Sequence, residues 1–311
     1  MRTSDSLRKT YGETLVELGE KNKNIVMLEA DLGNSTMSSL FGNVYPERYF
    51  QMGIAEQNMA SVAAGLSLTG KIPFINSFAV FASGRAYDQI RSSITIASLN
   101  VKICGSSAGL SDYGDGKTHQ SIDDIALMQV LPNMTVLSPC DAVETEQMVK
   151  AMVENKGPMY IRINRNDLPV VTDPNAEYHI GKMTQVVEGK DVVVFATGIM
   201  VQQSIQAAKQ LKEEGIGVRV VNVSTIKPLD TKALLGFCDG VKAVVTAEEH
   251  NVIGGLGSIV AGALSKTRLP LDIIGVDDRY GTSAENYDIL LKHYGLESSD
   301  VAARIKAILA V

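Results

Sequence analysis

The sequence contains no tryptophan, only 5% aromatic residues, three cysteines and four histidines among 311 residues. The cysteines, Cys104, Cys140 and Cys238, lie far apart without the spacing of a metal or redox motif, so we expect small buried side chains in a reducing compartment. No apolar run approaches the roughly 20 residues that span a bilayer, and residues 1–6 lack the apolar core of a secretory signal. These absences predict a cytoplasmic protein that does not span a membrane.

Positive charge is also scarce, since 29 lysines and arginines face 35 acidic residues and give a net charge of −6 at pH 7. This acidic balance argues against nucleic acid and anionic membranes as partners. The hydrophobic share of 45% and the charged share of 21% are ordinary for a globular protein with a sizeable core. The length predicts two domains.

Short β-branched runs alternate with helical patterns along the whole chain, which is typical of parallel sheets covered by helices. We therefore predict an α/β fold with two parallel-sheet domains, the second one smaller. Residues 166–188 are proline-rich and lack periodicity, so we interpret them as a linker. The expected strands are 25–28, 49–52, 73–76, 101–105, 135–137, 159–163, 191–197, 217–223, 241–247 and 270–275, and the expected helices include 4–20, 142–155, 200–214, 231–238, 256–265 and 285–310.

A further helix follows the strand at 49–52 and runs to about Leu68, and a glutamate, Glu56, lies in its first turn. The helix dipole favours a carboxylate there, so one interpretation is a stabilising glutamate. The other is a partly desolvated carboxylate suited to proton chemistry. The second interpretation rests on small residues that allow close packing on every side and predict a buried helix: Ala55, Ala60, Ala63, Ala64 and Gly65.

An aromatic group within residues 77–88 stands out in a chain with few aromatic residues. Phe78, Phe81 and Tyr87 recur at helical spacing, which usually indicates core packing. The alternative is a platform for a flat heteroaromatic ring.

Polar residues gather after several predicted strands, at the sheet edge where open α/β folds bind ligands. The loop 106–121 carries Asp115 and His119, and Ser121 is expected to cap the next helix. The alternative for His119 is an ordinary solvated loop position. For the polar residues that follow the first strand, the alternative is turn and cap chemistry. The remaining groups are Glu29, Asp31, Asn34 and Ser35 after the first strand, and Arg162 and Arg165, which either bind an anion or form exposed ion pairs.

Two glycine motifs are candidates for binding sites. Gly114-Asp115-Gly116 is similar to the start of a diphosphate–magnesium motif, but residues 135–145 lack the asparagine pair that completes it, so we reject that site. The segment 254–258, Gly-Gly-Leu-Gly-Ser, opens a helix and could bind an anion. Close helix packing is the favoured interpretation, because the third glycine of a dinucleotide site is missing.

Over nearly its whole length the chain resembles the C-terminal half of a transketolase. Seven segments carry the resemblance, and their order and spacing make it specific although each is modest alone. They are Arg8-Lys9, Asn34-Ser35-Thr36, Ile54-Ala55-Glu56-Gln57-Asn58-Met59, Phe78-Ala79-Val80-Phe81, Asp115-Gly116-Lys117-Thr118-His119-Gln120, Thr225-Ile226-Lys227-Pro228-Leu229-Asp230 and Glu248-Glu249-His250.

The resemblance implies a pyrimidine-binding domain at 1–170 and a transketolase C-terminal domain at 185–311. The family's N-terminal domain, which holds Mg²⁺ and the diphosphate of thiamine diphosphate, is missing from the sequence. The resemblance therefore implies a separate N-terminal subunit that holds the metal, a cofactor shared between the two chains, and an α2β2 heterotetramer. None of the site residues of this chain is expected to bind metal.

The same resemblance implies roles for individual residues. Glu56 would hydrogen-bond and protonate the pyrimidine nitrogen, which favours the imino tautomer and so carbanion formation. Phe78 and Phe81 would pack on the pyrimidine ring, and Asp31 would lie near the cofactor. The substrate residues would be His119, which also stabilises alkoxide charge, Asp115, which reads a hydroxyl, and Arg8, Ser35 and Arg165, which hold the sugar phosphate.

The implied reaction transfers a two-carbon ketol unit from a ketose phosphate to an aldose, as in the pentose phosphate pathway. Ser107 and Gly114 depart from the family's usual histidine and glutamate, so an unusual sugar or sugar-acid phosphate is an alternative substrate. An extra residue near Ser83-Gly84 leaves the third ring-packing position unassigned.

Three other functions stay open. Two are thiamine enzymes with the same domains, a deoxyxylulose-phosphate synthase fragment or the β subunit of a 2-oxo acid dehydrogenase. The segments 225–230 and 56–59 favour transketolase over both. The third is a non-catalytic scaffold subunit, which would need neither Glu56 nor His119.

Overall fold

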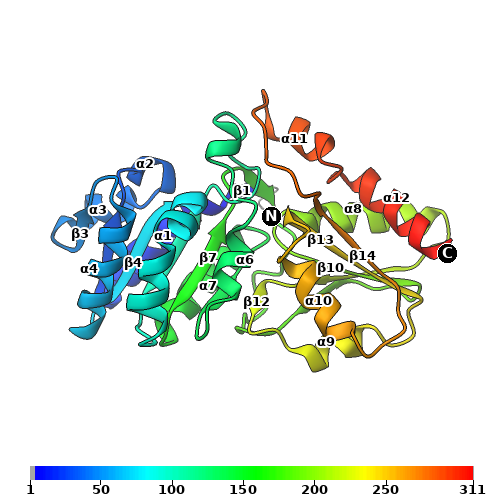
Figure 1. Ribbon diagram of the computed structural model, residues 1–311, viewed down its shortest axis with the longest axis horizontal. Coiled ribbons are helices and arrows are strands. Elements are labelled where there is room, and N and C mark those ends of the chain that lie inside the picture. The colour runs from blue at the N-terminus through cyan, green and yellow to red at the C-terminus, as the bar shows by residue number, and fades with distance from the viewer. Residues whose placement is uncertain (1–3, 311) are drawn as a thin grey trace.

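Two sheets, one built mainly from each half of the chain, form the framework of the computed structural model, which describes residues 4–310 (Figure 1). The first sheet has seven strands in the order β12-β6-β7-β5-β4-β2-β3, and all but β12 run parallel. Its central strands are buried along their whole length, as a parallel sheet covered on both faces requires. The strands are β2 (Ile25–Glu29), β3 (Tyr49–Gln51), β4 (Ile72–Phe78), β5 (Lys102–Ser106), β6 (Thr135–Leu137), β7 (Met159–Ile163) and β12 (Thr225–Lys227).

Helices cover both faces of this sheet. On one face α1 (Leu7–Lys21) packs beside α7 (Ala142–Glu154) through apolar side chains that include Tyr11, Leu15 and Met148. The other face is covered by α4 (Glu56–Leu68), the π-helical segments η2 (Phe81–Arg85) and η3 (Ile90–Thr95), and α6 (Asp124–Gln129). Short helices α2 (Gly33–Thr36), α3 (Ser39–Val44), η1 (Pro46–Arg48), α5 (Tyr87–Gln89) and η4 (Gly116–Thr118) lie in the connections.

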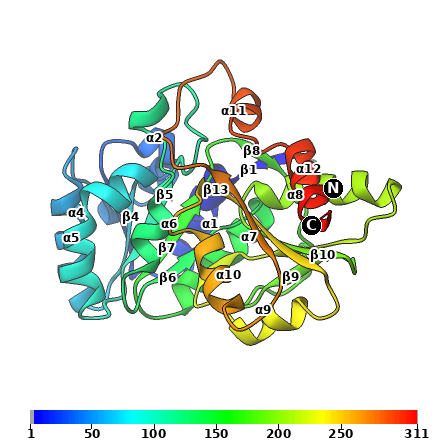
Figure 2. The same cartoon turned by 45° about the vertical axis from the view of Figure 1, so that its right-hand side comes forward.

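The second sheet has five strands in the order β14-β13-β10-β11-β9. Helices α8 (Met200–Glu213) and α12 (Ser298–Leu309) cover one face, and α9 (Thr231–Phe237) and α10 (Leu256–Leu264) cover the other (Figures 1 and 2). Helix α11 (Tyr287–His293) lies near the boundary between the two sheets. The strands are β9 (Thr184–Val187), β10 (Val192–Ala196), β11 (Val218–Asn222), β13 (Ala243–Asn251) and β14 (Leu271–Val276).

The two halves are interlocked as well as adjacent. Strand β12 belongs to the second half of the sequence, yet it pairs antiparallel with β6 at the edge of the first sheet. The Lys227 ammonium group donates a hydrogen bond of 2.9 Å to the Gln129 carbonyl oxygen. At the same boundary Asn222 Nδ2 donates to the buried Glu144 Oε1 at 2.9 Å. A cut between the halves would therefore remove backbone pairing from the first sheet.

The predicted α/β fold with two sheets is confirmed, but four local predictions are wrong. The first helix begins at Leu7, because Ser6 caps it and Ser4–Ser6 form strand β1, paired with β8 (Asp167–Pro169). The expected linker, 166–188, therefore contains the whole of β8 and of β9. Such short strands depend on distant pairing partners rather than on periodicity. Asp123, not Ser121, precedes α6, and the expected helix 285–310 is two helices separated near Gly295, whose φ is +69°.

Among residues 4–310, no helix combines the length and the apolar character needed to cross a bilayer.

Candidate active site

A pocket of about 440 Å³ lies where the strands of the first sheet end. Its walls come from the connections that follow β2, β3, β4 and β5, so four parallel strands deliver their side chains to one place. The lining residues are Ala30, Asp31, Leu32, Ile54, Glu56, Phe81, Arg85, Thr118 and His119.

Glu56 begins α4, and its side chain is only 1% exposed. Its Oε1 atom accepts a hydrogen bond from Arg85 Nη1 at 2.8 Å. Its Oε2 atom is buried and has no hydrogen-bond partner among the residues the structure describes. Because an unpaired buried carboxylate oxygen is costly, Oε2 is the acceptor that a bound ligand could satisfy.

Helix α4 is buried on one face only, so the prediction of packing on every side is wrong. Met59, Ala60 and Ala63 pack against the sheet beside Glu56. On the outer surface Leu68 and, just before the helix, Ile54 are each 75% exposed. The small residues allow close packing, but within one chain nothing in the described structure covers this outer face.

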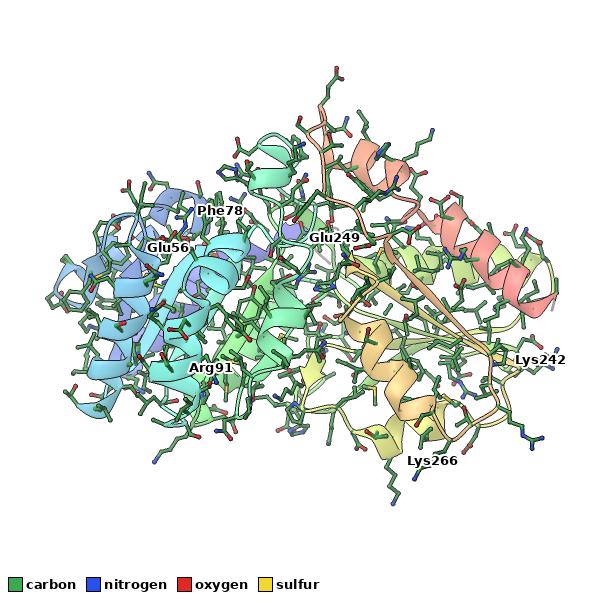
Figure 3. The ribbon with its side chains drawn as sticks, in the orientation of Figure 1. Glu56, Phe78, Arg91, Lys242, Glu249 and Lys266 are labelled. Carbon is green, nitrogen blue, oxygen red and sulfur yellow. The ribbon has the colours of Figure 1, made fainter. Side chains whose placement is uncertain are left out.

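The rings of Phe81 and His119 lie in the wall of the pocket, and Phe78 lies behind them, on the side of the molecule that carries Glu56 in Figure 3. Phe78 ends β4 and is buried, and its ring stacks on Phe81 with 6.2 Å between centroids and 16° between planes. The imidazole of His119 meets both rings edge-on, at 6.1 Å and 5.3 Å. Phe78 thus joins the core, as helical spacing suggested, while Phe81 lines the pocket as a platform would. Tyr87 is partly buried against the core.

Two arginines lie beside this pocket. Arg8 Nη1 donates to the Ser35 carbonyl oxygen at 2.7 Å, and Arg165 Nη1 pairs with Asp112 Oδ2 at 3.0 Å. Burial, and then the neighbouring Arg165 guanidinium, lower the pKa of Arg8. The guanidinium of Arg165 also lies 5.9 Å from the Phe78 ring centroid. The carboxylates of Asp167 and Asp112 oppose the lowering of the Arg8 pKa, and a bound anion would act in the same direction.

The predicted acidic residues take different places. Asp31 is exposed at the pocket rim with φ of +63°, and its backbone N–H donates to Gln51 Oε1 at 2.8 Å. Asp115 is exposed in the loop and does not line the pocket, although it lies near enough to raise the pKa of Asp112. The larger cause of the raised Asp112 pKa is burial.

Glu29 is buried and shapes the rim rather than facing the pocket. Its carboxylate accepts hydrogen bonds from Ala30 N at 3.0 Å, Leu32 N at 3.2 Å and Thr36 Oγ1 at 2.8 Å, and from the Ser38 hydroxyl. Burial raises the pKa of Glu29 to about 7, and these hydrogen bonds oppose the shift. The turn-and-cap interpretation therefore holds for Glu29.

The loop that carries His119 is held by the second half of the chain. Glu249 on β13 accepts a hydrogen bond of 2.7 Å from Leu110 N. Gln120 Nε2 donates to the Thr282 carbonyl oxygen at 2.9 Å, and Ala284 N donates to Tyr113 O at 2.9 Å. In Figure 1 this loop, in green, lies beside the orange segment that precedes α11. In Figure 3 Glu249 lies at the boundary between the two halves of the chain.

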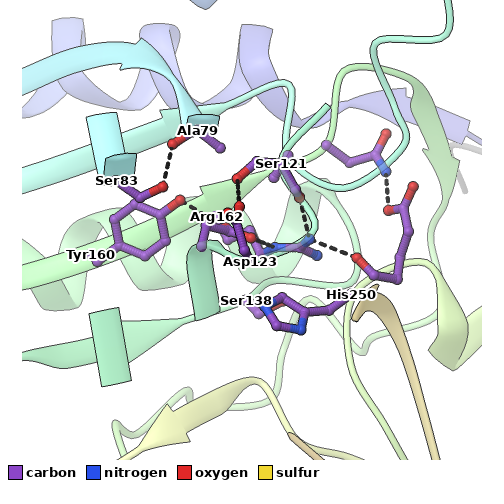
Figure 4. Close-up of polar contacts among 12 residues, drawn as sticks. Ala79, Ser83, Ser121, Asp123, Ser138, Tyr160, Arg162 and His250 are labelled. Atoms are coloured by element: carbon purple, nitrogen blue, oxygen red, sulfur yellow. Dashed lines mark hydrogen bonds and ion pairs between the residues drawn. The ribbon is translucent and has the colours of Figure 1, made fainter. Parts of the chain in front are cut away.

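Arg162 supports this boundary instead of meeting a ligand. It is buried, its Nε lies 2.9 Å from Asp124 Oδ2, and its Nη2 donates to the Glu249 carbonyl oxygen at 2.7 Å. Figure 4 shows Arg162 enclosed by Ser121, Tyr160 and His250. Burial raises the pKa of Glu249 to about 7, with Arg162 opposing the rise.

The glycine segment at the start of α10 is filled by the chain itself. Leu256 N and Gly257 N donate to the carboxylate of the buried Glu248 at 2.6 Å and 2.8 Å. A side chain at Gly255 would collide with that carboxylate, and one at Gly257 would collide with Ile273. The close-packing interpretation is confirmed, and the helix N-terminus already holds an anion.

Sequence reasoning missed Arg85, Asp112 and Glu249 as parts of this arrangement. Arg85 lies in the aromatic stretch that drew attention to Phe78 and Phe81, so a basic residue there was the available signal. The π-helical turn that brings it to Glu56 has no sequence signature that we used. The contacts of Asp112 and Glu249 depend on folding of the loop.

Comparison with known proteins adds a family to this geometry. Residues 4–171 match the family model of the transketolase pyrimidine binding domain, and residues 181–301 match that of the transketolase C-terminal domain. The chain is 43% identical to a putative transketolase C-terminal section of Methanocaldococcus jannaschii, over 96% of this chain and 95% of that protein. It is 40% identical to a 6-deoxy-6-sulfo-D-fructose transketolase subunit of Clostridium sp. strain MSTE9, over 95% and 92% of the two chains.

A solved structure of a split gene transketolase, an inactive β4 tetramer, is also similar to this chain. The two share 48% sequence identity over 98% of each chain, with a TM-score of 0.89.

Proposed function

This chain belongs to the transketolase family, and we propose that it is the C-terminal subunit of a split, thiamine-diphosphate-dependent transketolase that is active only with a separate N-terminal subunit. The observation that carries the proposal is the pocket in which the buried Glu56 stands beside the Phe81 ring. It occurs in a chain similar over nearly its full length to a transketolase section and a transketolase subunit.

The residues present fit the pyrimidine ring of the cofactor. A flat heteroaromatic ring can stack on an aromatic face and donate or share a proton with a buried carboxylate. Phe81 offers an aromatic ring in the pocket wall, and Glu56 Oε2 offers a buried acceptor without a partner among the described residues. When bound, thiamine diphosphate supplies a nucleophilic carbon and an electron sink. Glu56 would hold the proton shared with the ring nitrogen, while Phe78, Phe81 and Asp31 shape the site.

The second pair of roles concerns the sugar. We assign the anionic end of the substrate to Arg8 and Arg165, because their guanidinium groups repel each other and gain from an anion. Ser35 is held beside Arg8, and His119 lies at the pocket wall where it can orient substrate hydroxyls. Asp115 would reach the substrate from the exposed loop.

The identity of the sugar is a separate part of the proposal. Ser107 is fully buried with φ of +53°, and its hydroxyl has no partner within residues 4–310. The Clostridium relative is a transketolase subunit for a sulfonated sugar. A sulfonate and a phosphate are both tetrahedral anions that an arginine pair can hold, so both belong among the donors to be tested.

The proposed partner would cover the open side of the pocket. Ile54 lines the pocket and is 75% exposed, and the neighbouring outer face of α4 is also exposed. We propose that the N-terminal subunit seats here, brings the Mg²⁺ and the diphosphate-binding residues, and assembles with this chain as α2β2. The cytoplasm is the compartment we expect.

The test is reconstitution with the N-terminal subunit in the presence of thiamine diphosphate and Mg²⁺. Xylulose 5-phosphate with ribose 5-phosphate is the first substrate pair, and a sulfonated ketose is the second donor. We expect turnover only in the mixture, and the Glu56→Gln variant should lower kcat by about 100- to 10,000-fold while the subunits still associate. Lys266→Ala, an exposed change far from the pocket in Figure 3, is the control.

Other outcomes would select the alternatives. Consumption of pyruvate with release of carbon dioxide would identify a different thiamine enzyme. Full activity of Glu56→Gln would contradict a catalytic role and support a scaffold subunit.

A further inference from the structure

The segment after β4 winds more widely than an α-helix. Residues Phe81–Arg85 form the π-helix η2, and the backbone N–H of Ala86 bonds to the Phe81 carbonyl oxygen five residues earlier. Single π-helical turns accommodate an additional residue and are frequent at functional sites. Here the wider turn brings Phe81 and Arg85, which begin and end it, to the same pocket.

Arg85 touches both of the groups that define that pocket. Its Nη1 donates to Glu56 Oε1 at 2.8 Å, and its Cζ lies 4.2 Å from the Phe81 ring centroid. The ring therefore supports the guanidinium from its face, while the carboxylate receives its N–H. The Arg85 side chain is 45% exposed and that of Glu56 is 1% exposed, so the arginine approaches from the solvent side.

The single hydrogen bond has a consequence for the second oxygen. A buried carboxylate without a counterion is strongly disfavoured, and the Arg85 guanidinium supplies that counterion to Glu56. Arg85 engages only Oε1, and Oε2 is left without a partner among the described residues. A bidentate arginine would have occupied both oxygens.

We infer that Arg85 is a positioning residue, which pairs with Glu56 Oε1 and orients the Oε2 atom toward the ligand in the pocket. The identity of that ligand as an aminopyrimidine rests on the proposed function. Because Arg85 engages Oε1, the Oε2 atom stays free to share a proton with the ring nitrogen. Arg85 thus acts on the reaction through Glu56 and does not need to touch the substrate.

Three variants test this inference. Arg85→Met removes the cation and keeps an apolar stem over Phe81, Arg85→Lys retains the charge, and Arg91→Met makes the same change at an exposed arginine that lies away from Glu56 in Figure 3. The affinity for thiamine diphosphate is measured by calorimetry on the reconstituted complex, and the pH–rate profile is recorded from pH 5 to 8.

We expect Arg85→Met to weaken thiamine diphosphate binding by about tenfold or more, the scale of one buried charged interaction. The acid limb of the pH–rate profile of this variant should move to higher pH, because a buried carboxylate without its cation takes up a proton more readily. Arg85→Lys should restore most of both properties, and Arg91→Met should match the wild type. Unchanged affinity and pH profile in Arg85→Met would overturn the inference, and so would tighter binding, since Arg85 would then compete with the ligand.

A measurement on the chain alone separates this inference from the proposed function. Without cofactor or partner, Arg85→Met should lose stability relative to the wild type as pH rises from 5 to 8, because Glu56 must then bury an uncompensated charge. Adding Glu56→Gln to Arg85→Met should abolish that pH dependence. If the complex binds no thiamine diphosphate but this pattern is present, the proposed cofactor is wrong and the role of Arg85 stands; if the pattern is absent, the role of Arg85 is wrong.

Discussion

The buried glutamates of residues 4–310, among them Glu29, Glu56 and Glu248, show how surroundings assign different tasks to one residue type. Glu248 accepts two backbone N–H groups at a helix start and so completes the structure of α10. Glu56 has a cation on one oxygen and no described partner on the other, which suits a ligand. Glu29 accepts four hydrogen bonds, yet burial dominates its titration.

The titration of Glu29 should be visible in the pH dependence of the unfolding free energy. Its pKa is raised by burial to about 7, so its folded-state proton is held more tightly than in the unfolded chain. The stability this gives is present below about pH 4.5 and is lost as pH rises through about 7, amounting to roughly 3 kcal/mol by linkage. Glu29→Gln should therefore lose less unfolding free energy than the wild type between pH 5 and pH 8, measured by urea titration.

Glu20→Gln is the matched control for that titration, because Glu20 is exposed on α1. It should follow the wild-type dependence on pH. If Glu29→Gln followed it as well, the titration of Glu29 would not be a source of the loss.

At the scale of elements, the loop between β5 and α6 carries His119 and Asp115 but is fixed from outside its own domain. The Glu249 carboxylate on β13 accepts a hydrogen bond from Leu110 N of this loop. The segment before α11 forms hydrogen bonds with Gln120 and Tyr113 of the same loop. A loop held by a side chain of a second sheet and by a distant backbone segment is more restrained than a loop closed only on itself. The second half of the chain therefore helps to place the loop that carries His119.

Glu249→Ala should loosen this loop. The change removes a hydrogen bond between a backbone N–H and a buried carboxylate, an interaction worth about 1.5–3 kcal/mol. It leaves the N–H group of Leu110 without its acceptor. We expect hydrogen exchange at Leu110 to accelerate by about tenfold or more, and kcat of the reconstituted enzyme to fall with little change in subunit association. Lys266→Ala, in the same half of the chain, should leave both unchanged, and slow exchange at Leu110 in Glu249→Ala would refute the restraint.

At the scale of the whole molecule, the two sheets share their apolar interior and part of their backbone pairing. One apolar cluster runs from Leu7 on α1 to Ile305 on α12. Strand β12 extends the first sheet from the second half of the chain, and Asn222 Nδ2 donates to the buried Glu144 across the boundary. Such coupling favours a single cooperative unfolding transition.

Asn222→Ala should lower the stability of both halves together. It leaves the buried Glu144 carboxylate without one donor, at a cost of about 1–3 kcal/mol. Hydrogen exchange of amides in β5 and in β10 should report the same decrease in unfolding free energy. Asn175→Ala, an exposed change, serves as the control. Destabilisation of β10 without β5 would show that the halves unfold separately.

Particular residues show how far prediction from the sequence reached. The strands 25–28, 101–105 and 159–163 were placed correctly, within one residue at their ends, because β-branched runs record burial on both faces locally. Glu56, Phe81, Asp31 and His119 were named from their motifs, and the structure brings them to one pocket. Asp115 lies outside that pocket, and the catalytic and binding roles of all these residues stay predictions.

The sequence by itself determined the α/β class, the division into two sheets and the transketolase resemblance, because periodicity and motif order are properties of neighbouring residues. Only the tertiary structure decided that Arg85 reaches Glu56 across 29 residues, that β12 joins the first sheet, that Glu249 holds the loop of His119 and that the outer face of α4 is uncovered. Those features depend on contacts between distant segments, and a pairing between distant residues leaves no periodic trace in either segment.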